Sequence, residues 1–405
     1  MRKRILVLTI ILSILIGFIF SFYYYEIKNL LIEIIFPDEY RKESEKIFHN
    51  VLSNIKEVRG LEPPNDSRIE IVTIDWVKEN WGKRQVEISL KEIEIKEEIY
   101  KALFLISENV SLKETTIKQS GYVLAATSGG VIYIVREYFN PYDLEKAYEI
   151  LSHEITHIIQ GKYFKTPSLK THDEIQAWSA LIEGDAGLTS KKFIERIKEN
   201  KIGLSLLFFK SYNSKNALDE ILFFPYKYGE NFILFLYNLG GWNKVNQAYE
   251  NIPKSTEQIL HPEKYLIYEE PIKVDGIRLN ISEWSIAKTE TYGEYFLRIM
   301  LSNWIGEDLS EKAAEGWGGD NFTFYIRENN VSNYVFFWKI VWDREEDALE
   351  FYSCFREMMN KTNSIEIIKD VWKNKNRFLS LKFLKNEVLL IGSNNEEIFK
   401  EILKI

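Results

Sequence analysis

Apolar side chains recur with a helical period along much of the first half of the chain. Between residues 37 and 58 they fall every four or seven positions among charged ones, which predicts an amphipathic helix. The same period predicts helices over residues 90–108, 140–161 and 171–197. The helix predicted at 140–161 begins with an asparagine suited to the N-cap and a proline after it, and a glycine marks its end.

Shorter segments alternate apolar and polar residues and predict strands. Residues 68–74 form one such segment, and segments 122–127 and 131–135 flank a Ser-Gly-Gly turn, which predicts a hairpin. After residue 320 we expect strand, strand, helix, strand, strand and helix, over residues 322–326, 334–342, 345–358, 378–383, 388–391 and 395–405. This mixture predicts the α+β fold class.

The N-terminus carries an uninterrupted apolar run. Residues 5–22 contain no charge, three basic residues precede them and three tyrosines follow, a pattern typical of a membrane-spanning helix. A cleaved signal peptide is the alternative, but the end of the run lacks the small residues that a signal peptidase needs. Because positive charges stay inside, we expect a cytoplasmic tail at 1–4, a single-pass anchor in the cell membrane at 5–25 and an extracytoplasmic catalytic domain.

Composition narrows the classes of function. The chain has 405 residues and a net charge of −8, with acidic and basic residues interspersed. No basic stripe is available for a phosphate backbone, so nucleic acid is not expected as a partner. The single cysteine, Cys354, excludes an intramolecular disulfide and a metal site built from cysteines. Any zinc site must therefore use histidine and carboxylate side chains.

A histidine pair in the predicted helix 140–161 carries the strongest chemical signal. His153 and His157 are four positions apart, so both project from one face and can share a zinc ion. Glu154 can accept a proton from water that zinc has made more acidic. The alternative is a pair of histidines that only pack within the helix. The His-Glu-x-x-His spacing favours a catalytic zinc site with Glu154 as its base.

A third ligand is expected, because catalytic zinc is usually held by three protein side chains. Glu183 in the next predicted helix is the first candidate, since small residues beside it permit close approach to the histidine helix. Asp185 is a candidate hydrogen-bond partner for a zinc-binding histidine. His172 is an alternative ligand that ranks below Glu183, because polar residues at the start of a helix usually cap it.

Three segments together resemble the gluzincin superfamily, the thermolysin-like zinc peptidases. They are residues 151–160, 180–186 and 255–265, and the likeness extends over about residues 130–320. More narrowly, they look like a family of predicted, largely uncharacterised prokaryotic metallopeptidases with a membrane anchor. The resemblance implies a zincin-like domain in which the two motif histidines and the later glutamate bind zinc.

The resemblance also implies roles outside the metal ligands. Gluzincins commonly stabilise the oxyanion with a downstream histidine or tyrosine, for which His261 is the first candidate and Tyr228 and Tyr265 the next. They bind extended substrate along an edge strand before the metal helix, which would lie at residues 131–135. The structural alternatives are a turn histidine before a proline and tyrosines that only pack.

These features predict a juxtamembrane helix at 26–60, a metallopeptidase domain at 61–320 and a small α+β domain at 321–405. The expected function is Zn2+-dependent hydrolysis of amide bonds in a protein or peptide. One alternative is a catalytically silent surface protein that binds or assembles partners on the same scaffold. Another is a zinc hydrolase that acts on a non-peptide amide. Glu154 favours catalysis, because a structural zinc site has no use for a base.

Overall fold

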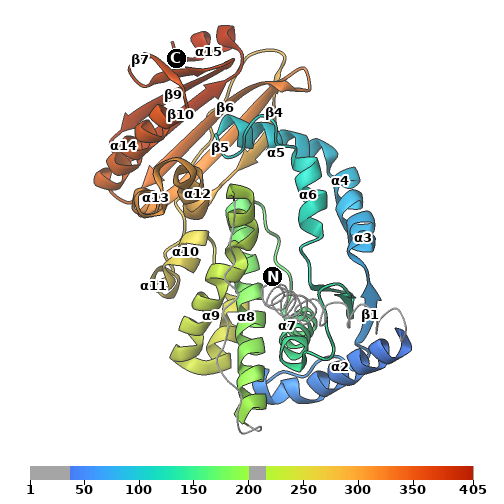
Figure 1. The fold of residues 1–405 in the computed structure, drawn as a ribbon. Helices are drawn as coiled ribbons and strands as arrows, with labels where there is room; N and C mark the ends of the chain where they lie inside the picture. Colours follow the sequence, from blue (N-terminus) through green and yellow to red (C-terminus); the bar gives the residue numbers. More distant parts are fainter. Residues whose placement is uncertain (1–36, 200–215, 405) are drawn as a thin grey trace, which may run out of the picture. The chain divides into compact units, whose positions relative to one another are not determined.

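The computed structural model describes residues 37–199 and 216–404 (Figure 1). The chain divides into two compact units. Unit 1 comprises Met1–Ile74, Val123–Lys162 and Thr189–Ile202. Unit 2 comprises Asp75–Tyr122, Tyr163–Leu188 and Gly203–Ile405. Helix α8 (His172–Glu199) begins in unit 2 and ends in unit 1, so one continuous element contributes to both.

Unit 1 combines helices with a small sheet around one apolar core. The strands are β1 (Arg68–Val72), β2 (Ala125–Ser128) and β3 (Val131–Val135), and β3 lies between the other two, parallel to β1 and antiparallel to β2. Helices α2 (Pro37–Arg59) and α7 (Leu144–Tyr163) bury apolar side chains in the same core. The predicted hairpin is confirmed, but the segment expected to be an edge strand is the central one.

Helix α7 starts later and ends later than the sequence pattern predicts. Asn140 forms a turn, because its Oδ1 accepts a hydrogen bond from the backbone nitrogen of Tyr142 at 3.0 Å. Asp143 caps the helix instead, accepting from the backbone nitrogen of Lys146 at 3.3 Å. Gly161 does not take the left-handed conformation by which a glycine ends a helix, so α7 continues past it.

Unit 2 contains a seven-stranded antiparallel sheet in the order β4-β5-β6-β10-β9-β8-β7. Its strands are β4 (Trp284–Glu290), β5 (Trp317–Arg327), β6 (Asn330–Trp342), β7 (Ile365–Ile368), β8 (Val371–Asn374), β9 (Arg377–Leu384) and β10 (Glu387–Ser393). Along β6, Phe336 and Trp338 enter one apolar cluster, while Val335 and Phe337 enter another. Both faces of the sheet are therefore buried. The α+β class is confirmed, and the domain boundary predicted after residue 320 falls inside β5.

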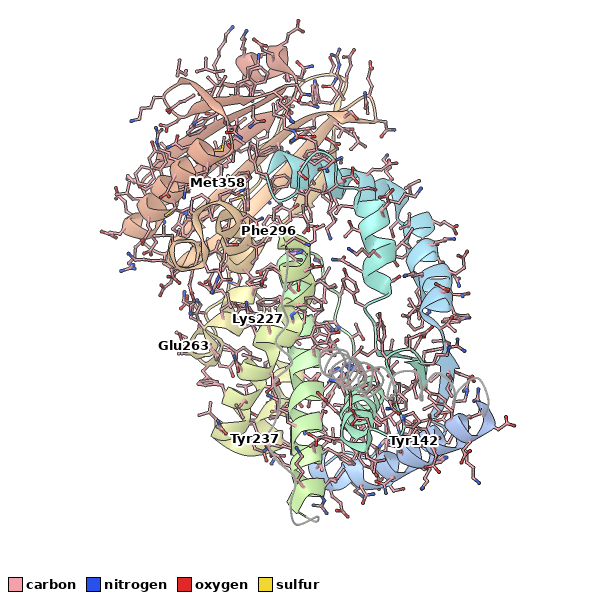
Figure 2. All side chains as sticks on the ribbon, viewed as in Figure 1. Tyr142, Lys227, Tyr237, Glu263, Phe296 and Met358 are labelled. Carbon is pink, nitrogen blue, oxygen red and sulfur yellow. The ribbon has the colours of Figure 1, made fainter. Side chains whose placement is uncertain are left out.

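Helices cover both faces of this sheet. Those that complete unit 2 are α3 (Ile74–Val77), the π-helix η1 (Lys78–Lys83), α4 (Arg84–Ile88), α5 (Leu90–Ala102), α6 (Leu112–Ser120), α9 (Ala217–Glu250), α10 (Thr256–Leu260), α11 (Pro262–Leu266), α12 (Gly293–Ile305), α13 (Glu307–Ala314), α14 (Glu345–Lys361) and α15 (Glu396–Ile402). Phe296 of α12 and Met358 of α14, labelled in Figure 2, are buried against one face. Helix α15 packs on the other face through Ile398, Phe399 and Ile402.

The predicted membrane localisation is corrected. No helix within residues 37–199 or 216–404 combines the length and apolar character needed to cross a bilayer, which contradicts a single-pass membrane protein. The predicted tail and anchor, residues 1–4 and 5–25, lie outside the described residues. The helix expected at 26–60 is present as α2, and its apolar face is buried in the core of unit 1.

Helices α8 and α9 approach each other backbone to backbone. A Cβ atom at Gly184 would lie 2.1 Å from the carbonyl oxygen of Gly229. A Cβ atom at Gly229 would lie 2.1 Å from the carbonyl oxygen of Ala180. Only glycine fits at either position. Glu183 and Tyr228, the residues that precede the two glycines, therefore flank this crossing.

We expect Gly184→Ala to destabilise the protein by about 1–3 kcal/mol, because the added methyl group must displace backbone. The matched control is Gly161→Ala in α7, where no atom lies within 4 Å of the new Cβ. That change should be neutral or stabilising by up to about 1 kcal/mol. Chemical denaturation measures both, and equal midpoints for the two variants would contradict the close contact.

Candidate metal centre

Helix α7 presents the two motif histidines away from its buried side. Leu151, Ile155 and Ile159 are fully buried in the core of unit 1 and form one stripe at helical spacing. His153 and His157 are only partly buried, with ring centroids 4.8 Å apart and ring planes at 83°. The apolar stripe thus determines the direction in which the two imidazoles point.

The protonation of His157 suits a metal ligand. Its Nδ1 lies 2.8 Å from Oε1 of Gln160. Because an amide oxygen only accepts hydrogen bonds, this contact places a proton on Nδ1, and in the neutral imidazole the lone pair then lies on Nε2. A hydrogen bond at one ring nitrogen is the usual way in which a metal-binding imidazole is oriented.

Glu154 is held by the hairpin that precedes α7. Its side chain is 7% exposed, and its Oε2 accepts a hydrogen bond from Oγ1 of Thr127 at 2.8 Å. The same hydroxyl lies 3.1 Å from the backbone oxygen of Glu154. Thr127 is in β2 and belongs to none of the sequence motifs. Its only sequence signal is its place in the predicted hairpin just before the motif helix.

Contacts within unit 1 orient the end of α8 along α7. Ser190 Oγ donates to the backbone oxygen of Glu149 at 2.9 Å, and Lys198 pairs with Glu145 at 2.8 Å. Later residues of α8 meet earlier residues of α7, so the two helices run antiparallel. Glu183 lies about two turns before Ser190 in α8, in the direction of the motif histidines.

The structure brings the three predicted ligands together. The ligand atoms of His153, His157 and Glu183 all lie within 4.8 Å of one another, and each side chain is partly exposed. Two imidazoles and one carboxylate form a donor set that fits zinc at a catalytic site, since three protein ligands leave one position open. Partial exposure gives an ion and a substrate access to these atoms.

The other polar residues of α8 have different surroundings. Asp185 is fully buried, and its Oδ2 accepts a hydrogen bond from the Tyr249 hydroxyl at 2.7 Å. The His172 ring packs against Tyr292 and Phe296. Burial lowers the pKa of His172 to about 3, so this imidazole is neutral at physiological pH. His172 does not belong to the ligand group found among the described residues.

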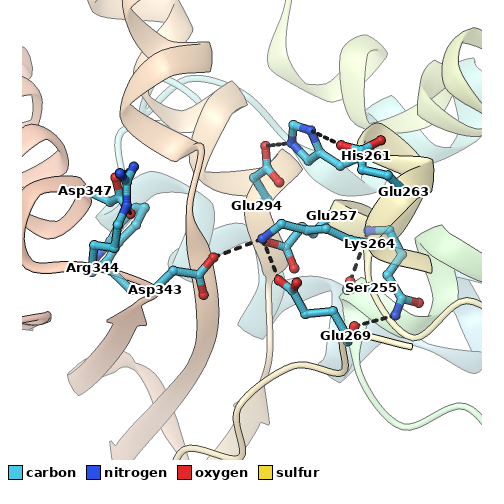
Figure 3. Close-up of polar contacts among 12 residues, drawn as sticks. Ser255, Glu257, His261, Glu263, Lys264, Glu269, Glu294, Asp343, Arg344 and Asp347 are labelled. Atoms are coloured by element: carbon cyan, nitrogen blue, oxygen red, sulfur yellow. Dashed lines mark hydrogen bonds and ion pairs between the residues drawn. The ribbon is translucent and has the colours of Figure 1, made fainter. Parts of the chain in front are cut away.

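His261 lies in a charged network of unit 2 that Figure 3 shows. Its Nε2 donates to Oε1 of Glu294 at 3.0 Å, and its Nδ1 lies 4.0 Å from Glu263. The hydrogen bond to Glu294, whose side chain is 2% exposed, raises the pKa of His261. This hydrogen bond therefore favours the protonated form of a partly exposed imidazole. Glu294 lies far from it in the sequence, and no local pattern marks the pair.

The tyrosines that the resemblance suggested also lie in unit 2. Tyr228 is partly buried beside Phe224 and Tyr295, and its ring lies 5.2 Å from the Lys227 ammonium. The Tyr265 hydroxyl donates to the backbone oxygen of Asn251 at 2.8 Å, which gives that side chain a structural role. The Tyr228 ring therefore lies beside a charged side chain.

Next to His261, Lys264 lies among three carboxylates (Figure 3). Its Nζ is 2.6 Å from Glu257, 2.7 Å from Glu269 and 2.9 Å from Asp343. These three side chains form a second acidic group of the kind that can hold a cation, and the lysine supplies the positive charge. Burial raises the pKa of Glu257 to about 8, against the effect of the Lys264 ammonium.

A family model of a domain of unknown function (DUF8575) matches residues 283–396, which span the seven-stranded sheet from β4 to β10. No curated protein matches the chain. Among solved structures, the chain resembles a protein of Chloroflexus aurantiacus described as a "putative hydrolase with a novel fold". The identity is 18%, the match covers 56% of this chain and 89% of that chain, and the TM-score is 0.34. This likeness is too weak to support a conclusion about fold or activity.

We expect Lys264→Met to destabilise the protein by about 2–4 kcal/mol at pH values well above 8, because Glu257 is then ionised and loses its cation while it stays buried. A carboxyl whose folded pKa lies above its unfolded value costs more stability as pH rises. The loss should therefore shrink as pH falls from 8 toward 5. Denaturation at several pH values measures it.

The matched control for this substitution is Lys400→Met, which removes an exposed pair with Glu396 at 2.6 Å. Exposed pairs of this kind contribute about 0.5 kcal/mol or less. A loss of equal size in the two variants, or one that does not depend on pH, would contradict the role assigned to Lys264.

Proposed function

We propose that this protein is a zinc-dependent peptidase of the gluzincin type, which hydrolyses amide bonds in proteins or peptides. One observation carries the proposal: two imidazoles and a carboxylate lie within ligand distance of one another, and the glutamate between the histidines is a base held in place by a hydrogen bond. A structural zinc site does not need a base, so the presence of Glu154 favours a catalytic site.

Each residue has a defined part in this hydrolysis. His153, His157 and Glu183 would hold the ion, and the neutral imidazoles leave most of its positive charge in place. A bound zinc ion supplies a Lewis acid that polarises a carbonyl group and makes water more acidic. Glu154 takes the proton from the attacking water and passes it to the leaving amine, so the carboxylate is regenerated in each cycle.

We assign the substrate-binding edge to β2 rather than to residues 131–135. The backbone N–H and C=O groups of β3 pair with β1 on one side and with β2 on the other, so β3 cannot pair with a peptide as well. Among the described residues β2 pairs with β3 on one side only, so its other edge can bind an extended peptide by main-chain hydrogen bonds. Thr127 of β2 contacts Glu154, which brings this strand next to the base.

For stabilisation of the oxyanion, His261 stays the first candidate and Tyr228 the second, as the resemblance implies. The hydrogen bond from His261 to Glu294 favours the protonated imidazole, which is a hydrogen-bond donor at both nitrogens. A protonated histidine is suited to a developing negative charge.

The first test is zinc content and hydrolysis of a broad peptide library by the full chain and by Glu154→Gln. We expect both proteins to bind one zinc ion and only the native protein to cleave, with a rate loss of about 10²–10⁴-fold or more in the variant. If both bind zinc and neither cleaves, the protein that binds or assembles partners becomes the better interpretation. Cleavage confined to non-peptide amides would favour the other alternative.

The second test concerns the third ligand. Glu183→Gln should weaken zinc binding by more than the roughly 10–100-fold that loss of a ligand's hydrogen-bond partner costs. Competition with a chromogenic chelator measures the affinity. The control is Glu195→Gln, an exposed glutamate later in α8, which should bind zinc as the native protein does. Equal affinities for the two variants would remove Glu183 from the ligand set.

A further inference from the structure

The hydroxyl group of Thr127 is the donor that the Glu154 carboxylate has among the described residues. It lies 2.8 Å from Oε2 and comes from a strand, not from the helix that carries the glutamate. We propose that Thr127 is the positioning residue for Glu154, which holds one carboxylate oxygen so that the other faces the water it deprotonates. This inference rests on the proposed peptidase function.

The backbone of β2 fixes the position from which the Thr127 hydroxyl extends. Thr127 pairs with Ile132 of β3, which is fully buried in the core of unit 1, so the backbone at Thr127 is tied to the sheet. A β-branched side chain has few accessible χ1 rotamers, which limits the positions of Oγ1. The hydrogen bond thus transfers the rigidity of the hairpin to a glutamate side chain with three rotatable bonds.

The two oxygens of Glu154 then have different tasks. Oε2 accepts the proton of the threonine hydroxyl, and Oε1 is left to accept the proton of water. Without the hydroxyl, the carboxylate can rotate and divide its time between productive and unproductive orientations. A displacement of about 1 Å at a reacting group can cost about 10²-fold in rate. The loss should appear in kcat, because substrate binding does not need this bond.

The test compares Thr127→Val, which keeps the shape of the side chain and removes the hydroxyl, with Thr127→Ser, which keeps the hydroxyl. With a quenched fluorescent peptide that the native protein cleaves, we expect Thr127→Val to lower kcat about 10–100-fold, with KM and zinc content unchanged within about twofold. Thr127→Ser should recover most of that rate. The matched control is Thr115→Val, which removes a partly buried hydroxyl bonded to the Ser111 carbonyl in unit 2.

A second readout does not depend on activity. In the zinc-free protein, Thr127→Val should lower the midpoint of thermal unfolding by about 2–4 °C. The same substitution in a Glu154→Ala background should have a smaller effect, because the carboxylate that the hydroxyl served is gone.

The outcomes separate this inference from the proposed function. Native kcat in Thr127→Val, or failure of Thr127→Ser to restore the rate, would overturn the positioning role while the peptidase stands. If the native protein cleaves no peptide, the proposed function fails, and the positioning of a catalytic base fails with it. The thermal comparison then shows whether the Thr127–Glu154 bond exists as a structural contact. Equal shifts of the unfolding midpoint in the native and Glu154→Ala backgrounds would contradict the Thr127–Glu154 hydrogen bond itself.

Discussion

The burial of one apolar stripe on α7 orients every side chain that this helix contributes to the candidate metal centre. Leu151, Ile155 and Ile159 have no exposed surface, so the helix cannot rotate about its axis without exposing them. The rotation in turn sets the directions of the two imidazoles and of Glu154. The hydrophobic effect is not directional. Through this burial it nevertheless positions side chains whose chemistry depends on their direction.

Helix α8 depends on a different constraint, because it is tied at two places along its length. Near its end, Ser190 is bonded to the backbone of α7 within unit 1. One turn and a half earlier, Gly184 meets the backbone of Gly229 within unit 2. Glu183 directly precedes that glycine, so it lies beside the close crossing of α8 and α9 within unit 2. Small residues beside a functional carboxylate therefore serve helix packing first.

Buried acids stabilise the segment 255–265 and the start of α12. Asp320 accepts hydrogen bonds from the backbone nitrogens of Tyr292 and Gly293 at the start of α12, and from two indole nitrogens. Asp173 accepts two from Thr256, through its backbone nitrogen and its hydroxyl. Such groups are costly to bury without partners, and these hydrogen bonds offset part of that cost. Thr256 and Asp320 therefore have a structural explanation.

Features that depend on neighbours in the chain could be predicted from the sequence alone. The apolar period of α2 and α7, the glycine turn of the hairpin and the spacing of His153 and His157 are all local, because helix and strand geometry repeats within a few residues. Features that depend on pairs of residues far apart in the chain emerge only in the folded protein. The fold placed β1 beside β3, which made β2 the edge, and it paired Thr127 with Glu154 and His261 with Glu294. No local period encodes such contacts, since they form only when burial brings separate segments together.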